Sequence, residues 1–355
     1  MATSTLLVTG STGFIGSHLV ARLLTSSPGR PVTLLVRPTG KLPAHIESRP
    51  GVRVVRLDCR TDPVPASLLA GVETVYHVAG TMTDWARRSD FELGNVVLTQ
   101  QLVDAALTHL ASPAPTLTRF VHVSTADVYG HPGTRPDETA ALDGASLPFG
   151  YAATKTRADQ IVQAAHQTRG LPAVILRPAT VYGPGSRDVV AEIATLLSKR
   201  SMLLISGGRA RAGLVYIDDM VDALLLAAST RGIEGEAFNV CGGAGDDTGG
   251  DITWRAYCDL IADELGVPRA SRSVPFGLAL GLGRLFEAAY ALARSYSHRP
   301  LVTRMAVYVT GRSQDVDVTK AREQLSFRAR TPVTEGVRRS VAWWRGEQGQ
   351  GSSQK

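Results

Sequence analysis

The opening of the chain constrains its fold more than any other stretch, because a short apolar run, three spaced glycines and a helical pattern follow one another. Residues Thr5–Thr9 have the apolar, β-rich composition of a strand, and Ser17–Leu24 repeat apolar residues at helical spacing. Gly10 would permit a tight turn, Gly13 a close approach of the backbone to a pyrophosphate, and Gly16 close packing of the helix on the strand. This order predicts a dinucleotide-binding unit, with a purely structural turn as the alternative.

Length and charge narrow the class of protein. A chain of 355 residues is too long for one small core and suits one large domain or two intertwined ones. Hydrophobic residues make up 44% and charged residues 20%, which is ordinary for a soluble globular protein. The net charge of +6 is spread along the chain without a long basic run, so nucleic acid is not an expected partner. The mildly basic surface could still attract an anionic cofactor or substrate.

Neither the cysteines nor the N-terminus points to secretion. The cysteines are odd in number and lack the spacing of a metal or redox site, which favours a reducing cytoplasm. They are Cys59, Cys241 and Cys258. The chain enters its first apolar strand almost directly after Met1, without the features of a signal peptide. We therefore expect a cytoplasmic protein without a metal site.

One later segment, residues 274–296, is long and apolar. Arg284, Glu287 and Arg294 interrupt it, so a membrane-spanning helix is not expected. Contact with a membrane surface remains open as the less favoured alternative. The same segment could form a lid or pocket wall over a lipophilic substrate, part of a domain core, or a dimer face.

The residue that follows the second predicted strand, Pro31–Val36, bears on the choice of cofactor. An acidic residue at this place would accept hydrogen bonds from the adenosine ribose, whereas this chain has Arg37. An arginine can hold a 2′-phosphate, so the sequence favours NADP(H) over NAD(H). The alternative is that Arg37 is an ordinary solvated charge at a strand end.

Tyr151 and Lys155 are the first candidates for catalysis. They stand four residues apart, so on a helix they lie one turn apart on the same face. The lysine charge favours the phenolate, and we expect it to lower the phenol's pKa from its ordinary value of about 10. Such a tyrosine could donate and accept a proton near neutral pH, although the spacing alone also occurs by chance.

Two hydroxyl residues, Ser124 and Thr125, follow the predicted strand Arg119–Val123. In doubly wound sheets, side chains at the carboxyl ends of central strands point into the crevice that binds ligands. The loop of residues 130–148 is rich in glycine and proline, and it can bring these hydroxyls to Tyr151. Together with the glycine loop, the hydroxyl at the strand end supports a catalytic role for the tyrosine and lysine.

Two other groups of polar residues are interpreted as structural. His77 ends the apolar strand Val72–His77 before a small-residue turn, where a histidine is more often structural than catalytic. Asp218 and Asp219 precede an apolar helical pattern. Their carboxylates are expected to cap that helix, with a metal site or an acid/base pair as the less favoured interpretation.

The glycine spacing in Thr9–Gly16 is G-x-x-G-x-x-G, and it resembles that of the extended short-chain dehydrogenase/reductase family, in the NAD-dependent epimerase/dehydratase superfamily. This resemblance implies an α/β fold, a doubly wound parallel sheet of the Rossmann type with a smaller C-terminal substrate domain. The dinucleotide-binding domain would comprise residues 1–178, completed by 214–241. The substrate-binding domain would comprise residues 179–213 and 242–345, and a disordered tail would follow at 346–355.

The resemblance also implies roles for individual residues. Thr125, Tyr151 and Lys155 match the family's catalytic residues, with Ser124 beside them, and the lysine would also bind the nicotinamide ribose. Asn95 matches an asparagine that stabilises the active-site backbone, with an ordinary helix cap as the alternative. The implied cofactor-binding residues are Gly10, Thr12, Gly13, Phe14, Ile15, Gly16, Arg37, Asp58, Cys59, Val78, Ala79, Gly80, Asn95, Tyr151, Lys155, Pro178, Thr180 and Val181.

Departures from the family pattern bear on the reaction. Sugar-nucleotide members usually have asparagine where this chain has Thr180. The dehydratases follow their catalytic threonine with Asp-Glu, where this chain has Ala126 and Asp127. The sequence after residue 274 resembles the 3β-hydroxysteroid dehydrogenase branch, including bacterial β-keto acid reductases.

We therefore expect an oxidoreductase that prefers NADP(H), with NAD(H) possible, and interconverts a secondary alcohol and a ketone. Its substrate would be a lipophilic or carboxylated small molecule. A nucleotide-sugar epimerase remains the alternative among enzymes, and a catalytically inactive NAD(P)-sensing protein the alternative outside them. Because homodimers are common in the family, the resemblance also implies a homodimer.

Overall fold

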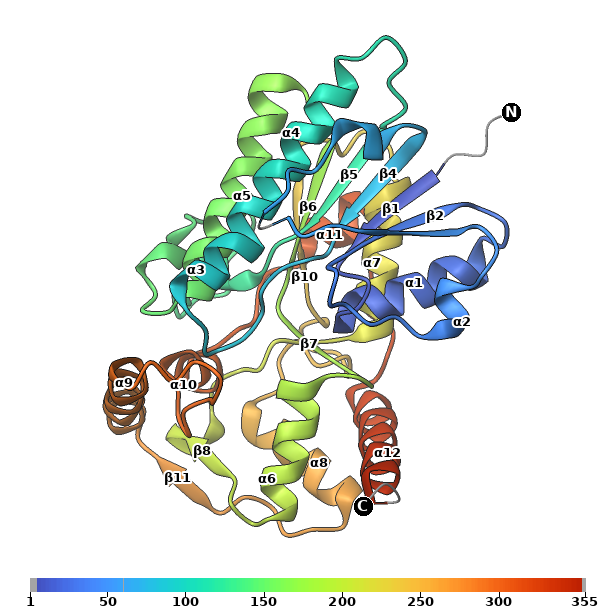
Figure 1. Cartoon of the computed structure of the whole chain (residues 1–355). Helices are drawn as coiled ribbons and strands as arrows, with labels where there is room; N and C mark the ends of the chain where they lie inside the picture. Colours follow the sequence, from blue (N-terminus) through green and yellow to red (C-terminus); the bar gives the residue numbers. More distant parts are fainter. Residues whose placement is uncertain (1–4, 60, 353–355) are drawn as a thin grey trace.

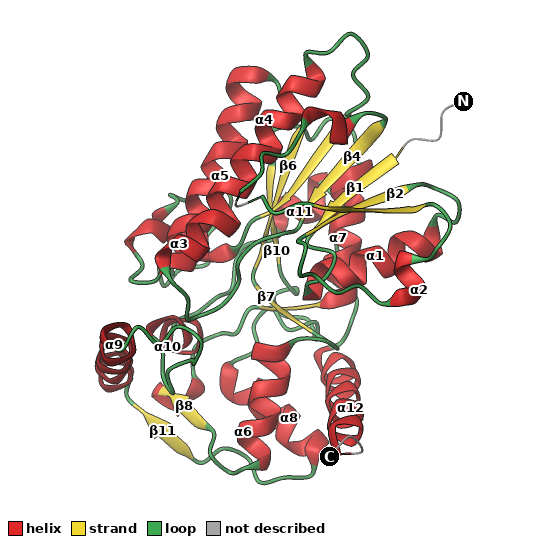
Figure 2. Ribbon diagram, in the orientation of Figure 1, coloured by secondary structure: helices red, strands yellow, loops and turns green. Residues whose placement is uncertain are grey.

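A parallel sheet of seven strands forms the centre of the protein (Figures 1 and 2). The computed structural model describes residues 5–59 and 61–352. The strand order is β10-β6-β5-β4-β1-β2-β3, and every neighbouring pair is parallel. The strands are β1 (Thr5–Thr9), β2 (Val32–Val36), β3 (Val52–Arg56), β4 (Val72–His77), β5 (Arg119–Val123), β6 (Ala173–Pro178) and β10 (Ala237–Val240). The order reverses between β1 and β4, which confirms the predicted doubly wound α/β fold.

Helices cover both faces of this sheet (Figure 1). On one face α1 (Phe14–Ser26) and α7 (Ile217–Ser229) pack together over a core that includes Leu19, Leu34 and Leu224. On the other face lie α4 (Leu98–Leu110) and α5 (Gly150–Arg169), over a second core. Burial on both faces explains why β2, β5 and β6 are buried along their whole length rather than at alternate residues.

A smaller region follows at the carboxyl end of the sheet (Figure 2). It has two parallel strand pairs, β7 (Thr180–Tyr182) with β9 (Leu214–Tyr216) and β8 (Leu203–Ile205) with β11 (Arg272–Val274). Its aromatic core contains Tyr182, Trp254 and Tyr257. Its helices are α6 (Glu192–Ser198), α8 (Trp254–Leu265), α9 (Phe276–Leu292), α10 (Arg304–Gly311) and α12 (Val333–Ser352). The helices α2 (Ala44–Glu47), α3 (Arg88–Phe91) and α11 (Thr319–Gln324) belong to or adjoin the larger region.

Two segments differ from their expected domain. Strand β9 pairs with β7 in a separate two-stranded sheet, not with the main sheet. Conversely, α11 packs against β10, and Ala321, Leu325 and Phe327 join the core beneath α1 and α7. The chain therefore returns to the larger region at about residue 319, because these three apolar side chains are buried in its core.

The predicted disordered tail also differs, because α12 continues to Ser352. Each residue added to an existing helix gains a backbone hydrogen bond, whereas starting a new helix costs free energy. Glycine, glutamine and serine can therefore prolong α12. Residues 353–355 of that prediction lie outside the described residues.

The acidic pair at the start of α7 does not act as a side-chain cap. Instead, the buried Asp219 carboxylate accepts the backbone N–H groups of Arg330 and Thr331 at 3.0 and 3.2 Å. Asp218 lies 3.6 Å from Arg339. The prediction of helix capping is therefore wrong in detail, since the pair secures the segment that leads into α12. Among the described residues, no helix is both long and apolar enough to cross a bilayer.

Candidate active site

The glycine loop between β1 and α1 has the geometry that its spacing predicts. Gly10 lies in the left-handed region at φ 75°, and a Cβ added to Gly16 would lie 2.1 Å from the Gly10 carbonyl oxygen. Neither position tolerates a side chain. Gly13 is different, because an added Cβ would meet only that same oxygen, at 3.3 Å, and the residue is exposed.

The same loop fits the phosphates of a dinucleotide. Gly13 precedes α1 without a side-chain cap, and the first turn of the helix carries no acidic residue, so its N–H groups are available to an anion. The hydroxyl of Ser11 is buried, and it has no hydrogen-bond partner among the described residues. An uncapped helix N-terminus and an orphaned hydroxyl at one loop suit a pyrophosphate.

His77 is a structural residue at the adjoining strand end. Its Nδ1 lies 2.9 Å from the Thr9 hydroxyl and its Nε2 lies 2.8 Å from the Thr99 hydroxyl. Burial, with a smaller effect from Lys155, lowers its pKa to about 3, so the ring stays neutral. Thr9 also accepts the N–H of Ala79 at 3.1 Å, so this network positions the turn after β4.

Asn95 supports the same turn from the opposite side. Its Oδ1 accepts the N–H of Thr81 at 2.7 Å, and its Nδ2 donates to the hydroxyl of Thr154 at 2.9 Å. It lies within a π-helical turn, η2 (Glu92–Val97), rather than at a helix N-terminus, so the alternative of an ordinary cap is wrong. The side chain thus connects the turn after β4 to α5, and π-helical turns are frequent at functional sites.

The structure brings the three catalytic candidates together. Tyr151 lies in the first turn of α5 with Lys155 one turn further along, and Thr125 follows β5. The Thr125 hydroxyl makes a hydrogen bond with the Tyr151 phenol. The buried Lys155 ammonium donates to the Val123 carbonyl at 2.6 Å. Ser124 stands beside them, and its buried hydroxyl has no hydrogen-bond partner among the described residues.

The electrostatics of this group differ from the expected ones. Burial raises the pKa of Tyr151 well above its ordinary value, nearby Asp127 raises it further, and the Thr125 hydrogen bond opposes both. Burial lowers the pKa of Lys155 to about 8. For the protein without cofactor, the predicted fall in the tyrosine pKa is therefore wrong, because Lys155 is directed at Val123 and desolvation dominates. The phenol is held in its protonated form, ready to donate.

A buried pair beside the trio has no counterpart in the sequence predictions. Asp127 Oδ1 lies 3.0 Å from His131 Nε2, and both side chains are almost fully buried. His131 has a left-handed backbone with φ 56°, and its Nδ1 lies 2.5 Å from Gln314 Nε2. Asp127 is only four residues away, but Gln314 comes from a distant segment, so no local pattern predicts the whole group.

A second buried network holds the helix that carries Tyr151 and Lys155. Asp159 on α5 accepts Arg177 Nε and Nη2, each at 3.0 Å. Arg177 also donates to the Tyr129 hydroxyl at 2.9 Å, and that hydroxyl donates to Asn239 at 2.7 Å. The chain of bonds fixes α5 to β6, β10 and the turn after β5.

The remaining predicted cofactor residues fall at one edge of the sheet. Arg37 is exposed after β2, Asp58 and Cys59 follow β3, and residues 78–80 follow β4. Pro178 ends β6, and Thr180 and Val181 lie in β7, while Thr12, Phe14 and Ile15 belong to the glycine loop and the start of α1. Because parallel strands end at the same edge, these residues border the crevice that the fold offers to a ligand.

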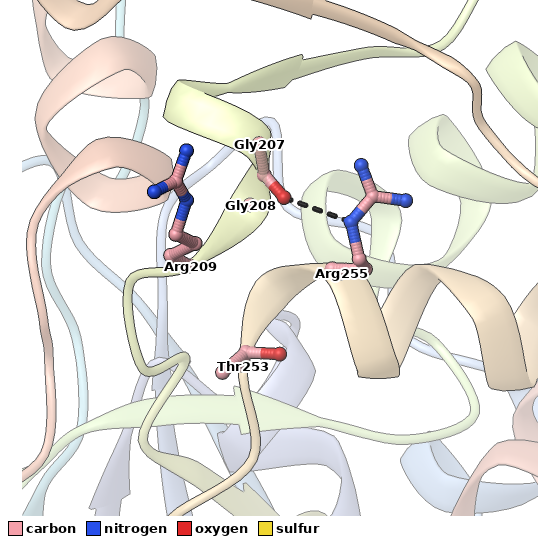
Figure 3. A pocket seen from close by; sticks show the side chains of 5 residues that line it. All are labelled: Gly207, Gly208, Arg209, Thr253 and Arg255. Carbon is pink, nitrogen blue, oxygen red and sulfur yellow. Dashed lines mark hydrogen bonds between the residues drawn. The ribbon is translucent and has the colours of Figure 1, made fainter.

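A separate pocket of about 360 Å³ opens in the smaller region (Figure 3). It is lined by Gly207, Gly208, Arg209, Thr253 and Arg255, and Arg255 Nε donates to the Gly207 carbonyl at 2.9 Å. The sequence predicted no binding or catalytic site at these residues. Within the described part of the chain, no group of three or more His, Cys, Asp or Glu residues is arranged to hold a metal.

The family follows from a match to a family model. The model of the NAD dependent epimerase/dehydratase family matches residues 6–241. The chain belongs to this family. The matched residues include the glycine loop, Thr125, Tyr151 and Lys155, so the candidate site lies in the part of the chain that the family shares. Family membership makes the chain an NAD-dependent enzyme of the oxidoreductase, epimerase or dehydratase kind.

Curated relatives and solved structures resemble the chain along nearly its whole length. It is 29% identical to a dTDP-glucose 4,6-dehydratase of Streptomyces antibioticus, over 96% of this chain and 92% of that protein. It is 27% identical to a 2-alkyl-3-oxoalkanoate reductase of Stenotrophomonas maltophilia, over 95% and 98%. A dTDP-glucose 4,6-dehydratase of Streptomyces venezuelae, solved with NAD bound, superposes with TM-score 0.74 at 27% identity, covering 98% of each chain.

Proposed function

We propose that this protein is an NAD(P)-dependent oxidoreductase that interconverts a secondary alcohol and a ketone on a lipophilic or β-keto/β-hydroxy acid substrate. The observation that carries the proposal is the hydrogen-bonded pair of Thr125 and the protonated Tyr151 at a strand end, with Lys155 one turn away. A bound nicotinamide supplies or accepts the hydride. In the reducing direction Tyr151 gives its proton to the carbonyl oxygen, and Thr125 stabilises the developing alkoxide by hydrogen bonding.

The substrate class rests on what the site has and lacks. Ala126 stands where an acid would be needed beside Asp127 to eliminate water, and Thr180 replaces the asparagine usual in sugar-nucleotide enzymes. The reductase relative acts on 2-alkyl-3-oxoalkanoates by its name, which supports a β-keto acid substrate. One relative, at 29% identity, is a dTDP-glucose 4,6-dehydratase, so conversion of a sugar nucleotide is the second candidate.

The proposed cofactor is NADP(H), with NAD(H) as the alternative. Arg37 is exposed immediately after β2, where a guanidinium can reach a 2′-phosphate. The structural neighbour holds NAD, which supports the unphosphorylated cofactor instead. Running NADPH and NADH in parallel decides between the two.

The test is the loss of reduced-nicotinamide absorbance with a panel of β-keto acids, 3-ketosteroids, simple ketones and dTDP- or UDP-sugars. We expect turnover on a keto substrate, faster with NADPH. Tyr151→Phe should lower kcat by about 10²–10⁴-fold and leave cofactor affinity nearly unchanged, because it removes only the transferable proton. Tyr290→Phe on α9 is the matched control. A fully active Tyr151→Phe enzyme, or turnover of sugar nucleotides alone, overturns the proposal.

A further inference from the structure

Helix α9 exposes its more apolar side. Leu278, Leu282, Leu285 and Leu292, which we call the α9 leucine face, are 59, 38, 65 and 88% exposed. Their spacing of 4, 3 and 7 residues puts them on one side of the helix. Ordinary surface helices bury this side and expose polar residues. Here the buried positions are Ala279, Gly283 and Glu287 instead.

The orientation of the α9 leucine face is fixed by contacts on the opposite side of the helix. Glu287 accepts the backbone N–H of Arg304 at 2.6 Å and the Arg304 guanidinium at 2.5 Å. A Cβ added to Gly283 would lie 3.2 Å from the backbone nitrogen of Arg304, so α9 and the start of α10 approach closely. Figure 1 shows α9 at the periphery of the molecule beside α10. The leucines therefore face outward because α10 holds the other side.

Charge around the leucines is of one sign. Between residues 271 and 301 the only carboxylate is Glu287, and it points inward to Arg304. Arg284 and Arg294 are exposed, and neither of them forms an ion pair with another described residue. An apolar helix face bordered by unpaired cations has the chemistry that binds at an anionic lipid surface.

We propose that the α9 leucine face docks on the surface of an anionic lipid bilayer, with the leucines in the acyl boundary and Arg284 and Arg294 at the headgroups. Pairing of two copies through this face is disfavoured, since a two-fold contact would bring the same arginines together without a carboxylate between them. The inference goes beyond the proposed reaction and stands independently of it.

Docking would bring the catalytic edge of the sheet toward the lipid. The segment just after α9 packs on the loop after β4: Trp85 Nε1 donates to the Ser295 carbonyl at 3.0 Å, and the Trp85 ring stacks on Tyr296 with the ring centroids 5.4 Å apart. That loop continues from the turn that Thr9 and Asn95 hold beside the glycine loop. A lipophilic substrate could thus be taken from the membrane without crossing water.

The test is cosedimentation of the full chain with phosphatidylcholine vesicles and with vesicles of phosphatidylcholine and phosphatidylglycerol, at low and high ionic strength. We expect binding to the anionic vesicles that weakens with salt. Leu285→Glu/Leu292→Glu should lower the affinity at least about tenfold, because it removes two apolar anchors and adds repelling charge. Leu203→Glu, at an exposed leucine of β8, should bind like the wild type, and thermal unfolding should show that all three proteins are folded.

Three outcomes overturn the proposal. One is equal binding of the wild type and the double variant. Another is equal binding to neutral and anionic vesicles. The third is a wild type that binds neither vesicle and sediments as a dimer that the double substitution splits, which would assign the face to a subunit contact. Since none of these measurements uses turnover, they test the membrane proposal separately from the catalytic one.

Discussion

Lys155 shows the conflict between stability and function at a single residue. The residue is 4% exposed, and its ammonium has one described hydrogen bond, to the Val123 carbonyl at 2.6 Å. Burial lowers its pKa from 10.5 to about 8. A charge near the phenol is what the chemistry needs, and holding that charge out of water costs stability. If Lys155 has its proposed role, a substitution there that stabilises the fold should abolish activity.

The pH dependence of stability should reveal this cost. Between pH 8 and 10.5 the unfolded chain binds the lysine proton and the folded chain does not, so this group makes unfolding less favourable as the pH rises. Below pH 8 the full cost applies, about 3 kcal/mol for a shift of this size. We expect Lys155→Met to increase the free energy of unfolding by about 1–3 kcal/mol at pH 7 and by less at pH 10. Urea unfolding at both values measures it, and an equal gain at both would contradict the linkage.

The glycine loop allows folding and cofactor binding to be separated by two substitutions. Gly16→Ala should destabilise the protein by about 1–3 kcal/mol, because its Cβ would lie 2.1 Å from a backbone oxygen. Gly13→Ala should change stability by less than about 0.5 kcal/mol, since the backbone there is extended. Its methyl would occupy the space that a pyrophosphate needs, so dinucleotide affinity should fall on the order of tenfold. Thermal unfolding and fluorescence titration with NADH check the two effects; a stable Gly16→Ala protein would contradict the first.

The residues that could be predicted are those with local signals. The glycine spacing and the Tyr151 and Lys155 spacing are short-range patterns, and their expected placement is what the structure has. His131, by contrast, is buried against Gln314, which lies 183 residues away in the sequence. The direction of the tyrosine pKa could not be predicted either, because burial and the Asp127 charge depend on the folded surroundings. Patterns within one element are visible in the sequence, and contacts between elements are not.

At the scale of elements, strands were predictable to within one or two residues where both faces of the sheet are covered. Strands β1, β4, β5 and β10 begin and end where their apolar runs do. The π-helical turn η2 was not predicted, since it interrupts a continuous apolar helical pattern. Nor was the bond from Asp159 to Arg177, which fixes α5 and depends on the register between a helix and a strand.

Because the ion pair of Asp159 with Arg177 fixes α5, we expect a substitution at Asp159 to have a large effect on stability. Asp159→Ala leaves the Arg177 guanidinium buried without its carboxylate, so the free energy of unfolding should fall by about 3–5 kcal/mol. Glu92→Ala breaks the ion pair between Glu92 and Arg157, which also lies on α5. The two side chains are 34 and 52% exposed, so the free energy of unfolding should fall by at most about 1 kcal/mol. Chemical denaturation of both variants makes the comparison. Equal losses would mean that the buried pair does not secure the helix.

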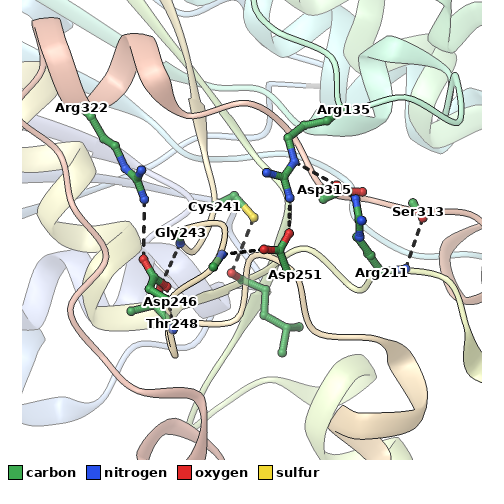
Figure 4. A network of polar contacts seen from close by, with 12 residues as sticks. Arg135, Arg211, Cys241, Gly243, Asp246, Thr248, Asp251, Ser313, Asp315 and Arg322 are labelled. Carbon is green, nitrogen blue, oxygen red and sulfur yellow. Dashed lines mark hydrogen bonds and ion pairs between the residues drawn. The ribbon is translucent and has the colours of Figure 1, made fainter.

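At the scale of the molecule, a polar network connects the two regions (Figure 4). The buried Asp315 carboxylate accepts Arg135 Nε at 3.0 Å and Arg211 Nη1 at 2.9 Å. Arg135, on the loop before α5, also pairs with Asp251 after β10. Arg211 precedes β9, and its N–H donates to Ser313 at 3.2 Å. Loops that are far apart in the sequence thus share one carboxylate at the junction of the larger and smaller regions.

This junction should determine whether the protein unfolds as one unit. Three of the four tryptophans, Trp254, Trp343 and Trp344, lie in the smaller region, and Trp85 on the loop after β4 contacts Ser295, so tryptophan fluorescence reports mainly on the smaller region. In the wild type we expect fluorescence and far-ultraviolet circular dichroism to follow one urea transition. Asp315→Ala removes the shared acceptor, so stability should fall by about 1.5–3 kcal/mol and the fluorescence transition should move to lower urea than the dichroism.

The matched control is Asp263→Ala, which breaks an exposed ion pair with Arg269 on the smaller region and should leave both transitions where they are in the wild type. Coincident transitions in Asp315→Ala would show that apolar packing of the two regions, rather than the shared carboxylate, couples their unfolding. Separated transitions would mean that the smaller region can loosen while the sheet stays folded. In that case Asp315→Ala should raise KM for substrate and change dinucleotide affinity less, because Gly10, Gly13 and Gly16 lie between β1 and α1 of the larger region.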